Sequence, residues 1–341
     1  MKNKQNRRVI MILFSVIFLI GAGIMIWSYA LLPKDANQAL EKIIKKNPQA
    51  VISVGILDHG KEETYIYTAN GREDYQPYTY QIGSITKTFT GAMTAYEQAK
   101  GNLKLTDGNP SLEKLVTHTS GLSDEWEQEI AKNPNFTFSR QELYDYVDAL
   151  TLTESSFQYS NIGSGLAGAR VAEIYGKDTG ENFCSYQEAM NHFLTNELGL
   201  TETTVGGVGD FKDNWIWQDD DEMMADGAMT SNVTDLLKYG QLYLNNDSRY
   251  DYLQNAVTRL ADVNDSYGIG MFWILDDNND MIWHNGEINM ESEDGSEVGL
   301  QCFIGISPGR QRVVVVLSNV ICNLHEDTAY TDMLGYMLMD E

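Results

Sequence analysis

Hydrophobic and polar positions divide this chain into two strand-rich ends and a helical middle. Near the N-terminus, apolar and alternating runs predict strands at residues 50–57 and 63–68, joined by a turn at residues 58–60. Similar apolar and alternating runs occur near the C-terminus, where four more strands are predicted: residues 267–275, 281–284, 299–307 and 312–318.

Helical spacing of apolar residues dominates the region between these ends, from about residue 84 to 243. Further helices are predicted at residues 36–46 and from about residue 327 onward. Strands at both ends with helices between them predict an α/β (α+β) fold: an antiparallel sheet built from both termini, flanked by helices, with an inserted helical subdomain. A cleft is expected where the sheet and the subdomain meet.

An uncharged run at residues 9–32 departs from this pattern. At about 1.5 Å per residue a helix there covers about 36 Å, which exceeds a bilayer core of about 30 Å. The cations before it, such as Arg7 and Arg8, favour a cytoplasmic N-terminus. The run therefore predicts a single-pass membrane anchor at residues 1–33, with residues 34–341 outside the cell. A cleaved signal peptide is the alternative, since Ser28 and Ala30 offer small residues at a cleavage site.

Composition narrows the functional classes. The 341 residues include 43% hydrophobic side chains, enough for an ordinary core, so a disordered chain is excluded. Lys and Arg total 24 against 49 Asp and Glu, a net charge of -25. Because phosphate backbones repel such a chain, nucleic acid is not an expected partner.

Cysteine and histidine usage points away from metal chemistry. Cys184, Cys302 and Cys322 are too few for a disulfide framework and are expected to be small core residues, with a Cys302–Cys322 pair left open. The sequence has no CxxC or HExxH motif, and its five histidines are scattered. We expect neither a metal nor a cofactor.

The first candidate chemistry is Ser84 and Lys87, at the predicted start of a helix. Residues three apart on a helix share one face, so the two side chains should meet. A serine hydroxyl is a weak nucleophile until a neighbouring group takes its proton, and a lysine held away from water can do so. The helix N-terminus adds backbone N–H groups near a developing oxyanion.

A second S-x-x-K match shows that this motif alone is not specific. Ser111 and Lys114 have the same spacing, but Ser111 follows Pro110 and is interpreted as a helix cap, with Lys114 in solvent.

The second candidate is Tyr159 with Asn161, at a loop rich in Ser, Asn and Gly that leads into a predicted helix at residues 163–173. A tyrosine beside a lysine suits a proton relay. Tyr243 and Asn245 share the Y-x-N form, but they continue an apolar helical face and are interpreted as packing.

The third candidate is His284 with Gly286, on or at the end of a predicted strand. A single strand histidine is usually structural, but Gly286 would let a substrate approach the strand edge closely.

In this order, Ser84-x-x-Lys87, Tyr159-x-Asn161 and His284-x-Gly286 resemble the three motifs of the serine β-lactamase and penicillin-binding protein superfamily. The chain is most similar to its class C-like, D-alanyl-D-alanine carboxypeptidase branch. Four further segments also resemble this branch: residues 115–122, 226–231, 267–270 and 313–319. The resemblance covers roughly residues 40 to 335 and implies a β-lactamase/transpeptidase-like fold.

The resemblance implies a role for each motif residue. Ser84 would be the acylated nucleophile, Lys87 would help to deprotonate it, and Tyr159 would relay a proton to the leaving amine. Asn161 would bind the amide of the substrate. The remaining implied substrate-binding residues are His284, where many relatives carry lysine, Gly286, and Glu287, whose backbone N–H would form the oxyanion hole with that of Ser84. His118 lies in a segment that looks structural in the family and is left outside the site.

Acidic residues near His284 depart from the family pattern. Glu287 stands where small or hydroxylated residues are usual, and residues 291–297 are acidic, so a substrate carboxylate near His284 would feel these charges unless they face solvent. Residues 219–222 are interpreted as a solvated loop.

Two classes of function remain. The first is an anchored serine D,D-carboxypeptidase that removes the terminal D-Ala from peptidoglycan peptides, with β-lactams as covalent inhibitors and a link to glycopeptide resistance. A class C-like β-lactamase or an esterase is the enzymatic alternative. The second class is a tethered binding or sensor domain without catalysis. Since no motif residue is lost, the sequence favours an enzyme.

Overall fold

The computed structural model describes residues 32–122, 137–153, 156–219, 221–245, 247–292, 295–325 and 328–341. Within these ranges no helix has both the length and the apolar character needed to cross a membrane. Residues 9–31 of the predicted anchor lie outside the described part of the chain.

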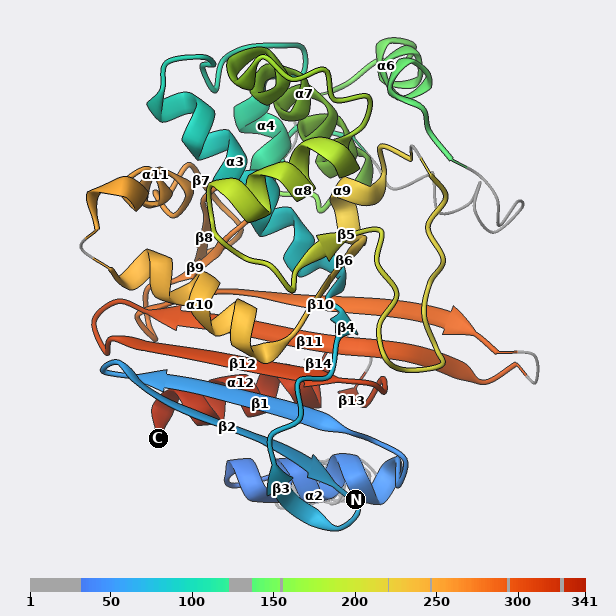
Figure 1. Ribbon diagram of the computed structural model, residues 1–341, viewed down its shortest axis with the longest axis vertical. Helices are drawn as coiled ribbons and strands as arrows, with labels where there is room; N and C mark the ends of the chain where they lie inside the picture. The colour runs from blue at the N-terminus through green and yellow to red at the C-terminus, as the bar shows by residue number, and fades with distance from the viewer. Residues whose placement is uncertain are drawn as a thin grey trace, which may run out of the picture.

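A large antiparallel sheet forms the base of the molecule (Figure 1), and within the described residues it has nine strands in the order β3-β2-β1-β12-β11-β10-β9-β8-β7. The N-terminal strand β1 pairs with β12, with Ile52 opposite Ser318. The sheet thus joins both ends of the chain, as the distribution of strand-like segments predicted. Its strands are β1 (Ile52–Asp58), β2 (Lys61–Thr68), β3 (Gly71–Asp74), β7 (Ala261–Asp262), β8 (Tyr267–Ile269), β9 (Ile274–Asp276), β10 (Met281–Glu291), β11 (Glu297–Ser307) and β12 (Arg312–Ser318).

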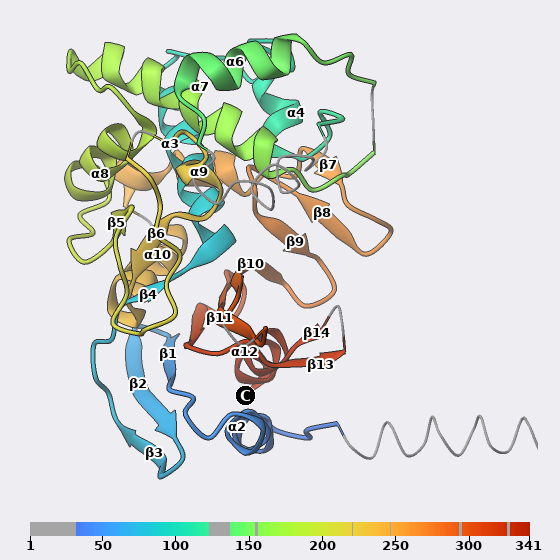
Figure 2. The same cartoon turned by 90° about the vertical axis from the view of Figure 1, so that its right-hand side faces the viewer.

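Helices cover both faces of this sheet because its central strands are apolar on both sides. In β12, Val313 and Val315 belong to the core beneath the helical region, whereas Val314 and Val316 belong to a second core on the opposite face. That second core is closed by α2 (Ala36–Lys46) and α12 (Tyr330–Asp340), which lie together in Figure 2. The core beneath the helical region is closed partly by α10 (Val233–Leu244).

The helical region stands on the other side of the sheet from α2 and α12 (Figure 2). A small antiparallel sheet, three-stranded within the described residues and ordered β4-β6-β5, connects it to the base. In chain order, the helical region and the small sheet together contain β4 (Tyr80–Gln81), a 3-10 turn η1 (Gly83–Ile85), α3 (Thr86–Ala99), α4 (Leu112–Val116), α6 (Arg140–Asp148), α7 (Asn161–Thr179), α8 (Tyr186–Asn196), β5 (Thr204–Val205), α9 (Met224–Gly227), β6 (Met229–Ser231), α10, a 3-10 turn η2 (Ser248–Tyr250) and α11 (Leu253–Ala256). The short strands β13 (Asn323–His325) and β14 (Thr328–Ala329) pair with each other.

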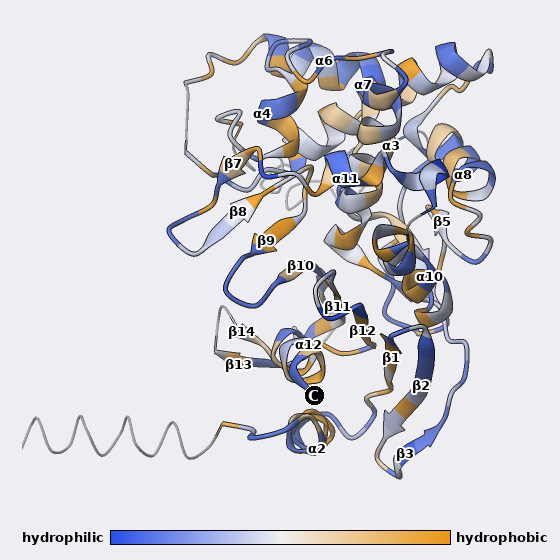
Figure 3. Cartoon of the chain, turned by 90° about the vertical axis from the view of Figure 1, so that its left-hand side faces the viewer, coloured by the Kyte–Doolittle hydropathy of each residue, from blue (hydrophilic) through white to orange (hydrophobic). Residues whose placement is uncertain are grey.

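Several strands differ from the sequence prediction. The single strand predicted at residues 267–275 is wrong: the chain turns back at residues 270–273, so this segment forms two paired strands, β8 and β9. Strand β10 continues to Glu291 because it pairs with β11 along its length, which places Glu291 opposite Glu297. Strand β3 was not predicted, since its sequence, Gly71–Asp74, is polar. Strand β3 forms an edge of the sheet. This strand and its neighbour β2 are largely hydrophilic (Figure 3), as an exposed edge requires.

The cysteines are free thiols. Cys302 and Cys322 are buried, as predicted, but Cys184 is exposed, so the expectation that it is a core residue was wrong. Cys184 directly precedes Ser185, the N-cap of α8, and its backbone N–H donates to Glu188 in the first turn of that helix. This position at a helix start leaves the thiol outside the core.

Candidate active site

Ser84 lies in the turn η1 that enters α3, which agrees with the predicted helix start. Two hydrogen bonds to the small sheet fix this turn: Ile82 N donates to the Met229 carbonyl at 2.9 Å, and Met229 N donates to Thr86 Oγ1 at 3.1 Å. Ser84 is half-buried at the surface of this rigid junction.

Lys87 lies one turn later on α3 and is fully buried. Its Nζ atom is 2.9 Å from Ser84 Oγ and donates to the Asp226 carbonyl at 2.6 Å. The Lys87 amine nitrogen is therefore held at the nucleophile by a backbone acceptor of α9.

Tyr159 reaches the same oxygen from the loop before α7. Its hydroxyl donates to Ser84 Oγ at 2.7 Å, and Lys87 Nζ lies 4.9 Å from the centre of its ring. With 36% of its surface exposed, Tyr159 is accessible from solvent. Ser84, Lys87 and Tyr159 thus form one connected cluster.

Asn161 is the first residue of α7 and is half-buried. The helix begins here because the Ser160 side chain caps it, accepting from Gly163 N at 2.9 Å. The Y-x-N spacing therefore places Tyr159 just before a helix and Asn161 at its start. The other S-x-x-K and Y-x-N matches have the predicted structural roles: Ser111 caps α4, and Tyr243 is buried in α10.

Strand β10 approaches the nucleophile so closely that two positions require glycine. A β-carbon on Gly286 would lie 1.9 Å from the Ile82 carbonyl oxygen and 3.2 Å from Ser84 N. A β-carbon on Gly83, whose φ is +51°, would lie 2.7 Å from Glu287 N. The backbone at residues 286–287 is consequently in contact with the turn that carries Ser84.

His284 lies on the face of β10 that Gly286 shares and is buried. Its Nδ1 atom is 2.5 Å from the Asn285 carbonyl, which can only accept, so Nδ1 carries the proton. Burial, with a contribution from Lys87, lowers the pKa of His284 to about 4. The neutral ring is left with Nε2 as an acceptor.

Glu287 leaves β10 on the opposite face, because side chains alternate along a strand. Its carboxylate accepts from Gln301 Nε2 at 2.8 Å on β11. The acidic side chain at this position thus points away from His284, and the backbone of residue 287 lies against Gly83.

His118, which the sequence analysis set aside as structural, lies directly against Tyr159. The two rings are stacked with centroids 4.5 Å apart, and His118 Nδ1 accepts from Ser160 N at 3.1 Å. No signal for this contact is present in the sequence, since His118 lies within a polar run, residues 117–120.

The interpretation of residues 219–222 as a solvated loop was wrong for two of them. Asp221 and Glu222 are buried. Asp221 accepts from the backbone of Phe138 at 3.1 Å and of Met223 at 3.0 Å, and Glu222 pairs with Arg140 at 2.9 Å. These contacts fix the start of the segment that carries the Asp226 carbonyl.

An aromatic segment borders the nucleophile turn. Trp215 exchanges two backbone hydrogen bonds with the Gln81 side chain, at 2.7 and 2.8 Å. The Trp217 ring lies beside Gly227, which in turn adjoins Gly83. Ile216 between them is 63% exposed, so this edge of the site presents apolar surface.

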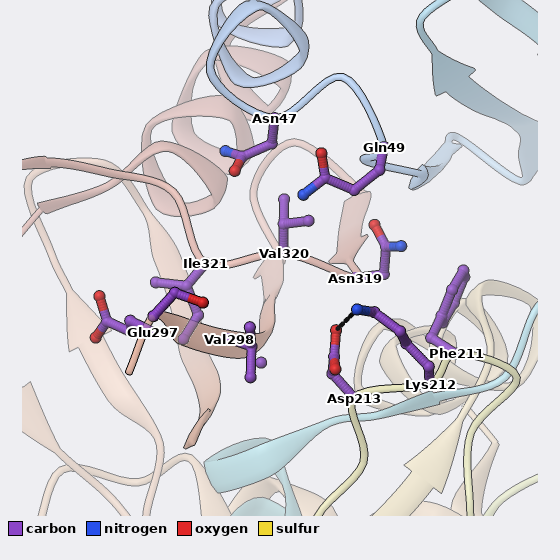
Figure 4. A pocket seen from close by; sticks show the side chains of 12 residues that line it. Asn47, Gln49, Phe211, Lys212, Asp213, Glu297, Val298, Asn319, Val320 and Ile321 are labelled. Carbon is purple, nitrogen blue, oxygen red and sulfur yellow. Dashed lines mark ion pairs between the residues drawn. The ribbon is translucent and has the colours of Figure 1, made fainter. Parts of the chain in front are cut away.

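A polar pocket of about 410 Å³ lies farther along the sheet, where β11 begins and residues 319–321 follow β12 (Figure 4). Lys212 and Asp213 form an ion pair of 3.7 Å on its wall. None of the predicted site residues lines it. Within the described ranges, no group of three or more His, Cys, Asp or Glu side chains could hold a metal ion.

Comparison with known proteins identifies the family of the chain. The profile of the β-lactamase family, "Beta-lactamase", matches residues 40–321. A β-lactamase of Providencia stuartii is 26% identical over 199 residues, which are 52% of this chain and 48% of that protein. The chain thus matches about half the length of this curated relative.

Solved structures share the fold over more of the chain. A class C β-lactamase superposes with a TM-score of 0.67 at 18% identity, covering 90% of this chain and 95% of its own. A "Beta-Lactamase/D-Alanine Carboxypeptidase" from Pseudomonas syringae gives a TM-score of 0.65 at 18% identity, covering 90% and 98%. Together with the family match, these neighbours confirm the resemblance inferred from the three motifs: the chain belongs to the β-lactamase family of serine hydrolases.

Proposed function

We propose that this chain is a membrane-anchored serine D,D-carboxypeptidase that removes the terminal D-Ala from peptidoglycan peptides through an acyl-enzyme at Ser84. The observation that carries the proposal is the convergence of Lys87 Nζ and the Tyr159 hydroxyl on Ser84 Oγ, at 2.9 and 2.7 Å. These are hydrogen-bond distances, so either group can exchange a proton with the nucleophile without rearrangement.

In the proposed reaction, Ser84 Oγ attacks the carbonyl carbon while its proton passes to the basic form of the Lys87 and Tyr159 pair, in which either Lys87 is a neutral amine or Tyr159 is a phenolate. The backbone N–H groups of Ser84 and Glu287 bind the oxyanion. When the C–N bond breaks, Tyr159 supplies the proton to the leaving amine. Water then hydrolyses the ester, which releases the shortened peptide and returns the proton to Ser84.

Substrate recognition is assigned to the residues around this cluster. Asn161 binds the substrate amide, and Gly286 allows the peptide backbone to lie against β10. His284 faces the site as a neutral ring, so binding a terminal carboxylate there requires either proton uptake by His284 or another donor. β-Lactams, which mimic the acyl donor, are expected to be covalent inhibitors.

The neutral state of His284 favours one second candidate, hydrolysis of esters, because an uncharged ester, unlike a D-Ala-D-Ala peptide or a penicillin, has no carboxylate that requires a cation at that position. The names of the similar proteins include both β-lactamase and D-alanine carboxypeptidase. A binding domain without catalysis is disfavoured by the assembled Ser84, Lys87 and Tyr159 cluster.

One experiment separates these activities. The purified chain is incubated with a peptide ending in D-Ala-D-Ala and, separately, with a penicillin, and products and intact protein are analysed by mass spectrometry. Release of D-Ala together with a persistent penicillin adduct supports the carboxypeptidase. Rapid penicillin hydrolysis with intact peptide favours a β-lactamase, and inertness toward both, and toward esters, favours the binding domain.

The cellular part of the proposal rests on the predicted anchor at residues 1–33. Expression should convert pentapeptide wall precursors to tetrapeptides and so support glycopeptide resistance in cells that make an alternative terminus. Removing residues 1–33 should preserve activity on soluble peptide and weaken this effect, since confinement at the membrane raises the effective concentration of lipid-linked substrate. Unchanged precursors in cells with active, anchored enzyme would contradict it.

A further inference from the structure

His118 contacts both neighbours of Tyr159 as well as its ring. The His118 carbonyl accepts from Gln158 N at 2.7 Å, and His118 Nδ1 accepts from Ser160 N at 3.1 Å. The imidazole stacks on the phenol with an interplanar angle of 29°. One residue therefore fixes the backbone on either side of Tyr159 and the plane of its side chain.

The backbone of His118 shows that a side chain is retained here at a cost. Its φ is +55°, in the left-handed region that favours glycine and asparagine. The ring is nonetheless enclosed, with Phe272 in edge contact at 5.3 Å and Phe157 at 5.8 Å. A purely conformational role at this position would be served by glycine.

The contacts also define the protonation state of the ring. Because Nδ1 accepts from a backbone N–H, the proton of the neutral imidazole must lie on Nε2. Burial lowers the pKa of His118 well below its ordinary value, and the nearby Lys87 and His284 act in the same direction. Nε2 is enclosed and has no hydrogen-bond partner among the residues that the structure describes. The face offered to Tyr159 is therefore uncharged.

We infer that His118 is a positioning residue for acylation: it holds the Tyr159 ring in the orientation that places the phenol oxygen against Ser84. The inference rests on the proposed acyl-enzyme function. Tyr159 is 36% exposed, so without this support its ring could turn toward solvent and lose the 2.7 Å contact with Ser84. A misplacement of this kind costs roughly 10- to 100-fold in rate.

Two substitutions each remove one of the side-chain contacts of His118 and keep the other. In His118→Asn, the side-chain oxygen can replace Nδ1 as acceptor and the residue tolerates positive φ, but the stacking is lost. In His118→Phe, stacking remains and the acceptor is lost. Each should slow acylation by a penicillin about 10- to 100-fold, with the loss in the rate of the covalent step and little change in the preceding binding constant. His192→Asn, at a half-buried histidine bonded to Tyr175, is the matched control and should leave both unchanged.

A double-mutant cycle separates positioning from general stability. If His118 acts through Tyr159, then His118→Asn in a Tyr159→Phe background should cause no further loss of acylation rate. An equal loss in both backgrounds, or wild-type rates in both His118 variants, would overturn the inference.

A measurement on the unmodified chain covers the case in which the variants do not fold. Nitrogen-15 spectra should show His118 neutral, with its proton on Nε2, at about pH 6.5, where an ordinary histidine is half protonated. The Tyr159 ring should flip slowly. A charged ring, a proton on Nδ1, or a freely flipping Tyr159 would overturn the inference. This measurement needs no substrate, so failure of wild-type acylation, which contradicts the proposed function, is distinguished from failure of the His118 assignment.

Discussion

The amide of Asn285 on β10 donates to the Asp332 carboxylate on α12 at 2.8 Å, directly behind the strand that carries His284 and Gly286. Asp332 is half-buried as a residue, but its Oδ1 atom is enclosed without a hydrogen-bond partner among the described residues. Burial, together with the nearby Glu287 carboxylate, raises the pKa of Asp332 to about 7.

This relationship predicts a pH-dependent stability. The folded chain binds more protons at Asp332 than the unfolded chain between about pH 4 and about 7. The free energy of unfolding contributed by this group therefore falls as pH rises through that window, by at most about 1.4 kcal/mol per pH unit. Asp332→Asn should gain stability relative to wild type as pH rises, measured by urea unfolding at several pH values.

The control for this prediction is Asp251→Asn, at an exposed carboxylate. It should keep the wild-type pH dependence. A constant difference between Asp332→Asn and wild type from pH 4 to 7.5 would show that Asp332 is ionised throughout.

A penicillin should form its covalent adduct on Ser84. Ser84→Ala removes the nucleophile, so no adduct should remain, whereas Ser111→Ala should be labelled like wild type because Ser111 only caps α4. Intact mass and peptide mapping check this. Labelling of Ser111, or of the Ser84→Ala variant, would place the nucleophile elsewhere.

Lys87→Ala and Tyr159→Phe should each lower the acylation rate by roughly 10²- to 10⁴-fold, the range of positioned proton transfer. Lys87→Ala removes the 2.9 Å contact between Lys87 Nζ and Ser84 Oγ, and Tyr159→Phe removes the 2.7 Å contact between the Tyr159 hydroxyl and Ser84 Oγ. Lys114→Ala, in the other S-x-x-K match, is the matched control. A folded Lys87→Ala or Tyr159→Phe variant with near wild-type rates would remove that residue from the relay.

Gly286→Ala should lose nearly all acylation activity and unfold at a lower temperature than wild type. The added methyl group would lie 1.9 Å from the Ile82 carbonyl oxygen, which forces β10 away from Ser84. Gly227→Ala provides a control for stability, since its nearest neighbour would be 3.6 Å away. Thermal melting and penicillin acylation check the prediction. Full activity in Gly286→Ala would show that β10 need not contact the nucleophile turn.

The sequence was sufficient to predict the central strands of the sheet and the Ser84, Lys87 and Tyr159 cluster, because apolar strand patterns and helical spacing are local and the motifs occur in order. It did not reveal that His118 stacks on Tyr159. Nothing in the spacing of residues 118 and 159 signals a contact, and positive φ at His118 is visible only in the folded backbone. The burial of Asp221 and Glu222 was missed for the same reason: their partners, Phe138 and Arg140, are distant in the chain.

The pairing of β1 with β12 sets the order of events during synthesis. Ile52 cannot pair until Ser318 has been synthesised, so the middle of the sheet cannot form until almost the entire chain has left the ribosome. Strand β10, which borders Ser84, joins the N-terminal strands only through β11 and β12. Nascent chains that stop before residue 312 should therefore remain without a completed nucleophile site, and full-length chains should fold slowly for their size because their central contacts are so distant in sequence.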